Sequence, residues 1–287
     1  MHDDKTFICG IGAQKAGTSF LADYLYQHPE FMMSPLKELH YFDVKFLPET
    51  CSGFETRFIN SISRITQGFI SNNKVSLERL FALIKRIEAS RENDYRIFFN
   101  YFVQNKHLAF GEITPSYSML NKEHFAYIAS IYPKHKFIFL LRNPADRFWS
   151  QINYDLESTH KNDNPLELID KCFKKENYIL RSNYERTIKE LLSVVDKSNV
   201  CIEFYENIFS KKSEETIAKI SEFIGINFYP ELLNSKKKVN TTSYKASLTE
   251  NYRLKIINNL QNTYKYIIEE YDAPESWKND YETIRNK

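Results

Sequence analysis

The sequence predicts a single α/β domain of three layers, in which a central parallel sheet of about five strands carries helices on both faces. Three observations lead to this fold class. Short apolar runs alternate with helix-like segments along the chain. One run, residues 136–141, is almost entirely apolar, which is typical of a parallel strand covered on both faces. A glycine-containing loop also separates the first predicted strand from the first predicted helix.

The size and charge of the chain narrow its class. Its 287 residues, taken as one domain over 1–287, can bury a large core without disulfides or metals. The 39 Lys and Arg nearly balance the 37 Asp and Glu, so the net charge is only +2. This balance argues against a generic nucleic-acid-binding protein. Neither a signal-peptide pattern nor an apolar stretch of ~20 residues is present, so we expect a cytoplasmic protein without a transmembrane segment.

The first predicted elements are a strand and a helix around the glycine-containing loop. Residues 6–11 are rich in strand formers. Leu21, Tyr24 and Leu25 recur at i, i+3 and i+4, which predicts an amphipathic helix over 18–27. The order is therefore strand, loop, helix.

The later elements continue this alternation. Residues 44–106 contain few turn signals and are expected to be mainly helical, as an insertion outside the sheet. Further strands are predicted at 31–33, 108–110, 136–141 and 199–204, and further helices at 122–132, after Pro144, at 178–195 and at 213–224.

The loop from Gly12 to Ser19 is the first segment with recognisable chemistry. A glycine-containing loop that enters a helix offers free backbone N–H groups and the positive end of the helix dipole to a phosphate. Lys15 adds a cation, and Thr18 and Ser19 add hydroxyl donors. The spacing fits neither the Walker A loop nor the dinucleotide-binding glycine motif. A turn that merely needs glycine remains the alternative interpretation.

A second basic segment follows the strand at 136–141. Arg142 lies at the end of that strand, where its planar guanidinium can bind a phosphate through two N–H groups. Ser150 lies two helical turns further on and can face the same ligand. An ion pair between Arg142 and Asp146 is the alternative. Two anion sites at the carboxyl ends of strands suit a nucleotide with two separated phosphate groups.

The third segment, residues 37–43, carries a carboxylate and an imidazole two positions apart. Alternation places Glu38 and His40 on one side of the chain, where they can act as a base and its orienting partner. An ordinary polar loop is the alternative. No third ligand has a suitable spacing and the four cysteines are scattered, so we predict no metal site.

Together these segments resemble the sulfotransferases that use 3′-phosphoadenosine 5′-phosphosulfate (PAPS). Residues 14–19 resemble the P-loop-like loop that binds the 5′-phosphosulfate, and residues 142–150 resemble the segment that binds the 3′-phosphate. Residues 37–42 are similar to the segment with the catalytic Glu and nearby His in glycan sulfotransferases of the heparan-sulfate type and their bacterial relatives. Residues 111–117 resemble a strand-to-loop segment of the same enzymes.

The resemblance implies PAPS as co-substrate, PAP as product, no metal, and a role for each matching residue. Lys15 would stabilise the leaving phosphate, and Glu38 would take the acceptor proton with help from His40. The resemblance also implies a set of nucleotide ligands: Gln14, Lys15, Ala16, Gly17, Thr18 and Ser19 at the 5′ end, Arg142 and Ser150 at the 3′-phosphate, Tyr184 near the adenine, and Lys245 in a closing loop at 239–250.

The acceptor is the least defined part of this prediction. We expect in-line transfer of the sulfuryl group to a hydroxyl, less readily an amine, of a glycan or small-molecule metabolite. Residues 44–106 and 151–180 would wall the acceptor side, and the aromatic run at 95–102 either lines it or packs in the core. Ile113 stands where heparan-type enzymes usually carry Lys, which argues against a polysulfated glycan.

Two other functions and the oligomeric state stay open at this point. A kinase with a P-loop-like fold would use ATP and Mg²⁺, with Glu112 or Asp146 as the metal ligand. A non-catalytic nucleotide-binding module would keep the fold without the reaction. The sequence also leaves open whether the chain forms a homo-oligomer.

Overall fold

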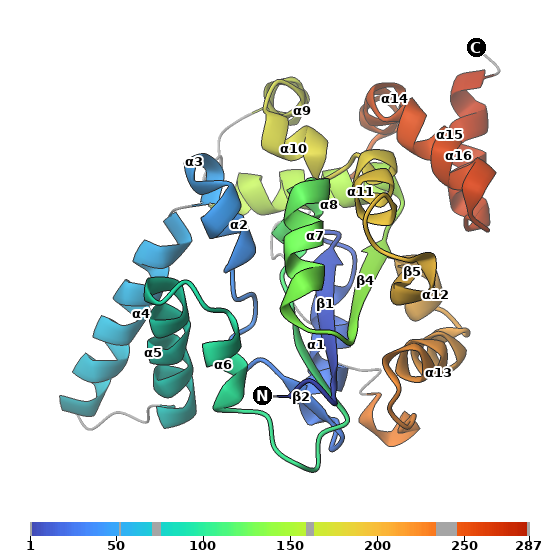
Figure 1. Cartoon of the computed structure of the whole chain (residues 1–287). Coiled ribbons are helices and arrows are strands. Elements are labelled where there is room, and N and C mark those ends of the chain that lie inside the picture. The colour runs from blue at the N-terminus through green and yellow to red at the C-terminus, as the bar shows by residue number, and fades with distance from the viewer. Residues whose placement is uncertain (1, 52, 71–75, 159–163, 234–245, 286–287) are drawn as a thin grey trace.

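A computed structural model describes residues 2–51, 53–70, 76–158, 164–233 and 246–285. Its centre is a five-stranded sheet in the order β2-β3-β1-β4-β5, with every neighbouring pair parallel (Figure 1). The strands are β1 (Thr6–Gly12), β2 (Phe31–Met33), β3 (Ala109–Ile113), β4 (His135–Leu141) and β5 (Val200–Phe204). All of the predicted strands are confirmed, and so is the parallel sheet.

The middle of the sheet is buried and tightly packed. Phe7, Ile8 and Cys9 of β1 are completely buried, as expected for a central strand covered on both faces. Gly111 of β3 pairs with Ile8, and a Cβ at Gly111 would lie only 1.9 Å from the Ile8 carbonyl oxygen. Only glycine allows the backbones of β1 and β3 to approach this closely.

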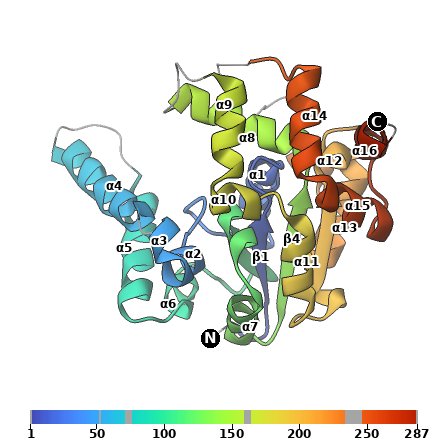
Figure 2. The same ribbon diagram turned by 90° about the horizontal axis from the view of Figure 1, so that it is seen from above.

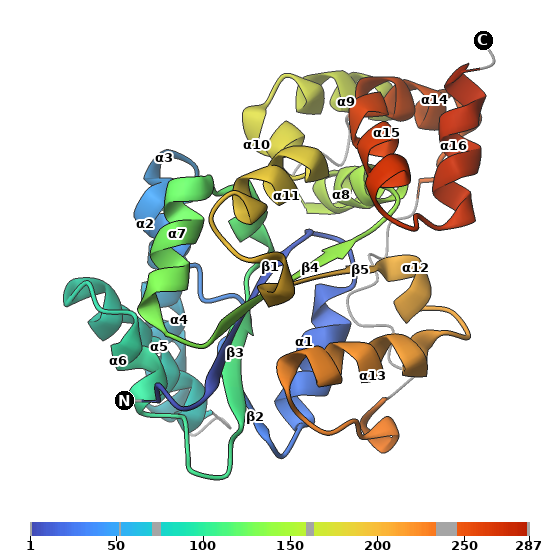
Figure 3. The same cartoon turned by 45° about the vertical axis from the view of Figure 1, so that its right-hand side comes forward.

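Helices cover both faces of the sheet, which confirms the predicted three layers. Figure 3 shows α1 (Thr18–Gln27) and α13 (Ser213–Ile224) on one face and α7 (Lys122–Ile131) on the other. The carboxyl ends of the strands lead into the β1–α1 loop, the short 3₁₀ helix η1 (Pro115–Met119), α8 (Pro144–Ser158) and α12 (Tyr205–Ile208). The chemically informative segments are therefore gathered at one edge of the sheet.

A group of helices lies between β2 and β3 in the sequence. It consists of α2 (Phe42–Phe46), α3 (Pro48–Cys51), α4 (Gly53–Ile70), α5 (Leu77–Arg91) and α6 (Arg96–Asn100). Helices α4 and α5 stand away from the sheet, on the side opposite the C-terminal helices (Figure 2). In the aromatic run at 95–102, Tyr95, Phe98 and Phe99 are buried in the core, whereas Tyr101 is half exposed.

The helix predicted over 178–195 is divided in two. Helix α10 (Glu176–Leu180) ends before Arg181, and α11 (Tyr184–Leu192) begins after Asn183. The side chain of Asn183 accepts a hydrogen bond from the backbone N–H of Arg186, and this cap starts a new helix.

The remaining helices complete the chain. They are α9 (Pro165–Phe173), α14 (Glu250–Asn259), α15 (Gln261–Glu270) and α16 (Glu275–Arg285), with the short 3₁₀ helices η2 (Lys197–Asn199) and η3 (Pro230–Leu232). The three C-terminal helices were not predicted from the sequence. Across the ranges that the structure describes, no helix is long and apolar enough to cross a membrane.

Candidate active site

The β1–α1 loop and the first residues of α1, together residues 13–19, form a candidate anion cradle. Gly17 caps α1 with φ 82°, and a Cβ there would lie 2.8 Å from the Phe209 ring, so both the conformation and the space require glycine. The first N–H groups of a helix have no partner within the helix and can bind an anion. Thr18 and Ala16 are buried, and the side-chain oxygen of Gln14 is buried without a hydrogen-bond partner among the described residues.

Lys15 brings a cation to this loop. Its ammonium group lies 5.0 Å from the ring centroid of Tyr154 on α8, a cation–π distance. Burial and, secondly, the nearby Arg142 lower the pKa of Lys15. Both effects penalise the charged ammonium. An anion bound in the cradle would offset them through its attraction to that charge.

Arg142 lies directly against the same loop. Its Nη1 donates a hydrogen bond to the Lys15 carbonyl oxygen at 3.0 Å, and its guanidinium lies 4.5 Å from the Tyr205 ring centroid. The alternative ion pair with Asp146 is not the pairing observed, because Asp146 binds Arg253 at 2.7 Å. The structure thus brings together the two basic residues that the sequence placed 127 positions apart.

The other predicted nucleotide ligands differ in their placement. Tyr184 is completely buried, and its hydroxyl donates to the Arg142 carbonyl oxygen at 2.9 Å. Ser150 is partly buried on α8, in the second turn beyond Pro144. Lys245 and most of the proposed closing loop at 239–250 lie outside the described residues.

A buried polar network fixes the turn that follows Arg142. The side-chain Nδ2 of Asn143 donates to Asp280 of α16 at 2.7 Å, and the Tyr264 hydroxyl of α15 donates to the side-chain Oδ1 of Asn143 at 2.8 Å. Arg253 of α14 pairs with Asp280 at 2.9 Å and with Asp146. The C-terminal helices therefore hold the turn after Arg142 in place. These contacts join residues 121 and 137 positions apart, and no sequence pattern predicts contacts over such distances along the chain.

The loop between β2 and α2, residues 34–41, carries the predicted acid–base pair of Glu38 and His40 and is the acid–base loop of this site. Glu38 and His40 both have positive φ values, 64° and 47°, a conformation that residues other than glycine seldom adopt. The Nε2 of His40 lies 3.3 Å from Glu38 Oε2, and its Nδ1 lies 2.6 Å from Asp43 Oδ2. Ser116, beyond β3, donates a hydrogen bond to the same Asp43 carboxylate. His40 is thus held between two carboxylates.

This setting favours a protonated imidazole. Burial is the largest single effect and lowers the pKa of His40, but hydrogen bonds and charge from Asp43 and Glu38 together outweigh it and raise the pKa to about 8. The ring also stacks on Phe54 of α4, with the two planes 11° apart. Sequence reasoning missed Asp43 and Ser116, although Asp43 lies only three positions after His40.

Glu112 and Asp146, the metal ligands of the kinase alternative, are committed to protein partners. Glu112 is buried and accepts hydrogen bonds from the Tyr95 hydroxyl at 2.6 Å, the Tyr117 hydroxyl at 2.9 Å and the Leu39 N–H at 3.2 Å. Burial raises the pKa of Glu112, while these hydrogen bonds oppose the rise. The contacts of Glu112, and the ion pair of Asp146 with Arg253, fit structural roles better than metal ligation.

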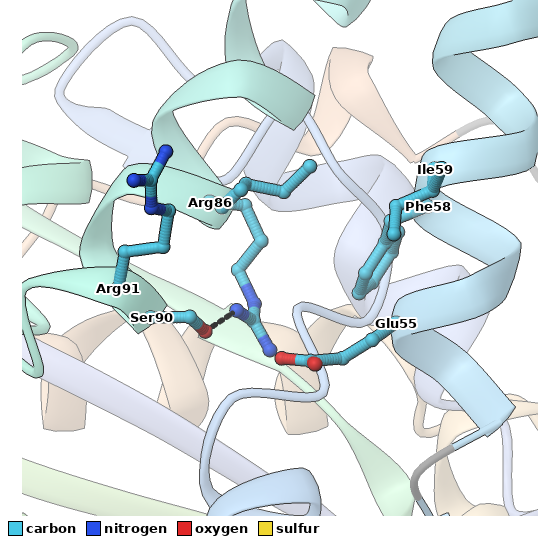
Figure 4. Close-up of a pocket in the computed structure, with 7 residues that line it drawn as sticks. Glu55, Phe58, Ile59, Arg86, Ser90 and Arg91 are labelled. Carbon is cyan, nitrogen blue, oxygen red and sulfur yellow. Dashed lines mark hydrogen bonds between the residues drawn. The ribbon is translucent and has the colours of Figure 1, made fainter.

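A cavity of about 220 Å³ lies between α4 and α5, beside the acid–base loop (Figure 4). Phe58, Ile59 and Ile87 give it apolar walls. Its remaining lining residues are Glu55, Arg86, Ser90 and Arg91. Arg86 connects the cavity to the loop, because its Nη2 donates to the His40 carbonyl at 2.6 Å.

Comparison with known proteins decides the family. A profile of the sulfotransferase family matches residues 7–231, which is most of the chain. The chain belongs to the sulfotransferase family. This confirms the PAPS-dependent sulfotransferase expected from the sequence and makes the chain an enzyme rather than a binding module or a kinase.

Solved structures agree with the fold of this sulfotransferase. A sulfotransferase from Alicyclobacillus acidocaldarius is 20% identical, with a TM-score of 0.63, over 96% of this chain and 98% of that one. The sulfotransferase domain of the curacin biosynthetic pathway is 17% identical, with a TM-score of 0.51, over 98% and 97%. Sulfotransferase STF9 from Mycobacterium avium is 12% identical, with a TM-score of 0.52, over 94% and 78%. No curated protein sequence matches significantly.

Proposed function

We propose that this sulfotransferase moves the sulfuryl group of PAPS to a hydroxyl of a small, weakly charged acceptor by in-line displacement. One contact carries the proposal: the ammonium of Lys37 donates to the Ser19 hydroxyl at 2.5 Å. Lys37 immediately precedes Glu38, and Ser19 belongs to the anion cradle. The acid–base loop therefore touches the loop proposed for the phosphosulfate, which is the adjacency that direct transfer requires.

The proposed reaction divides the chemistry between Glu38 and Lys15. The acceptor oxygen attacks the sulfur and its proton passes to the Glu38 carboxylate, while the bond from sulfur to the 5′-phosphate oxygen breaks. Lys15 neutralises the charge that develops on the departing phosphate of PAP. His40 orients Glu38; with its pKa raised to about 8 it is protonated at neutral pH and is a poor base there.

The nucleotide would be held along the cradle and the end of β4. Gln14, Ala16, Gly17, Thr18 and Ser19 would surround the 5′-phosphate, and Arg142 and Ser150 the 3′-phosphate. Tyr184 would act indirectly, by holding Arg142, because its buried hydroxyl donates to the Arg142 backbone carbonyl. The segment 239–250, with Lys245, is retained as the proposed closing loop.

The acceptor side is proposed to take an uncharged or weakly charged molecule. Phe54 stacks on His40, and Arg86 joins the apolar-walled α4–α5 cavity to the His40 carbonyl. Ile113 is buried. A densely sulfated polymer would need a cationic surface instead. Small phenols, sterols and simple sugars are therefore the acceptors to test first.

Thermal shift with PAP tests the donor site. PAP in the presence of EDTA should stabilise the protein, and ATP with Mg²⁺ should not. Lys122→Ala, a change of an exposed lysine on α7, should respond to PAP like the wild type. Stabilisation by ATP with Mg²⁺ alone would overturn the donor assignment.

A screen with ³⁵S-labelled PAPS tests the acceptor class. Labelled product should form with at least one small hydroxylated compound and be absent with Glu38→Gln enzyme. Transfer only to heparan-type polymers would contradict the proposed acceptor.

A further inference from the structure

Helix α5 carries a buried arginine, Arg86. Helix α5 buries Ala82, Leu83, Arg86 and Ala89. The Arg86 guanidinium lies 5.0 Å from the Tyr41 ring centroid and 5.4 Å from that of Phe58. Arg86 is only 1% exposed. Burying a guanidinium is costly unless its N–H groups find partners, so these partners indicate what the residue is for.

Arg86 donates hydrogen bonds to two backbone carbonyls of the acid–base loop and to one side chain of its own helix. Its Nε donates to the Leu39 carbonyl at 2.7 Å, and its Nη2 donates to the His40 carbonyl at 2.6 Å. Its Nη1 donates to the hydroxyl of Ser90, one turn further along α5, as Figure 4 shows. The rigid guanidinium thus joins the helix to two consecutive peptide groups of the loop.

The opposite edge of the loop is held as well. The Leu39 N–H donates to Glu112, and the Tyr41 N–H donates to the Tyr117 hydroxyl at 3.0 Å. Glu38 and His40 alternate with these fixed positions, and both have positive φ. A loop in this conformation would relax toward ordinary backbone angles unless its peptide groups were held from both sides.

We propose that Arg86 is a positioning residue that holds the 38–41 loop so that His40 and Glu38 face each other for the transfer. The proposal rests on the function proposed above for these two residues. Arg86 itself touches neither donor nor acceptor in this assignment. It connects the helical insertion, which walls the acceptor side, to the group that takes the acceptor proton.

The test uses Arg86→Met, which keeps much of the side-chain volume and removes every donor, and Arg86→Lys, which keeps the charge but not the planar fork. Arg91→Met is the matched control, because Arg91 lies on the same helix, lines the same cavity and has an exposed side chain (Figure 4). The primary readout is the titration of His40 in histidine-labelled protein by NMR, with the signal assigned from a His40→Gln spectrum. PAP affinity is measured on the same samples.

We expect Arg86→Met to lower the His40 titration midpoint by roughly one pH unit, because the contact with Glu38 is lost. Arg86→Lys should fall between Arg86→Met and the wild type, and Arg91→Met should match the wild type. PAP affinity should stay within about twofold in all three, and kcat with an identified acceptor should fall about 10- to 100-fold in Arg86→Met.

An unchanged His40 titration in a folded Arg86→Met protein would overturn the proposal. If that variant does not fold, Tyr117→Phe releases the same loop from its other side and must lower the midpoint too. Failure of the wild-type protein to bind PAP would instead overturn the proposed function, and the His40 titration would still decide the role of Arg86.

Discussion

The two halves of the proposed site are built in opposite ways. On the proposed nucleotide side, Lys15 lies over an aromatic ring and Arg142 donates one hydrogen bond to a backbone carbonyl among the described residues, so much of their donor capacity toward that part of the chain stays available for a ligand. On the acceptor side, His40 is bound to carboxylates through both ring nitrogens. The nucleotide side is organised to receive charge, whereas the acceptor side already contains its charge partners.

This difference follows from what each half must do. A phosphate brings its own negative charge, so cations and free N–H groups are enough to bind it. A proton acceptor must be oriented before the acceptor arrives, and orientation requires fixed backbone and side-chain contacts.

Removal of the proposed base should give the largest effect. Glu38→Gln should lower kcat by roughly 10³-fold, because the amide cannot take the acceptor proton, with PAP affinity unchanged. Steady-state transfer from ³⁵S-labelled PAPS measures the rate. If His40→Gln abolishes transfer and Glu38→Gln does not, the two roles are exchanged.

Removal of the cradle cation should come next. Lys15→Ala should lower kcat by about 10²- to 10³-fold, since stabilisation of the developing phosphate charge is lost, and should weaken PAP binding much less. Single-turnover kinetics and calorimetric titration with PAP separate the two effects. Normal turnover in Lys15→Ala would remove this residue from the mechanism.

Loss of the strand-end arginine should affect binding alone. Arg142→Ala should weaken PAP binding by about 10- to 100-fold, because the change removes the charge-assisted hydrogen bonds that we propose Arg142 makes to the 3′-phosphate. Binding of 5′-AMP, which lacks that phosphate, should change little. Equal losses for PAP and 5′-AMP would place Arg142 elsewhere on the nucleotide.

The smallest predicted effect concerns stability and pH. The pKa of His40 is raised from 6.5 to about 8 in the folded protein, so folding favours its protonated form. The stabilisation is complete below pH 6.5 and is lost as the pH rises through 8, and it amounts to about 2 kcal/mol.

Urea unfolding at pH 6 and pH 9 measures this contribution. The wild type should lose about 2 kcal/mol more between these pH values than His40→Gln does. His124→Gln serves as the control, because burial lowers the pKa of His124. Identical pH dependence in wild type and His40→Gln would show that the two carboxylates do not stabilise the charged imidazole.

The sequence predicted the sheet and the approach of Arg142 to Lys15, because both depend on local patterns. Apolar runs mark the strands, and Lys15 and Arg142 each follow a strand end, so a parallel sheet brings them together. The supports of the site were not predictable in the same way. Arg86 and Asp280 reach their partners across 46 and 137 residues, and such contacts leave no periodicity in the sequence. The break at Asn183 depends on one side-chain cap, which a helical pattern conceals.

The network around Asn143 also has a consequence for the order in which the chain is made. The turn that presents Arg142 shares its hydrogen bonds with Tyr264 and Asp280. During translation the sheet strands leave the ribosome first, yet this turn obtains its last partners only when α16 has emerged. A nascent chain should therefore form its sheet well before it can hold PAP tightly.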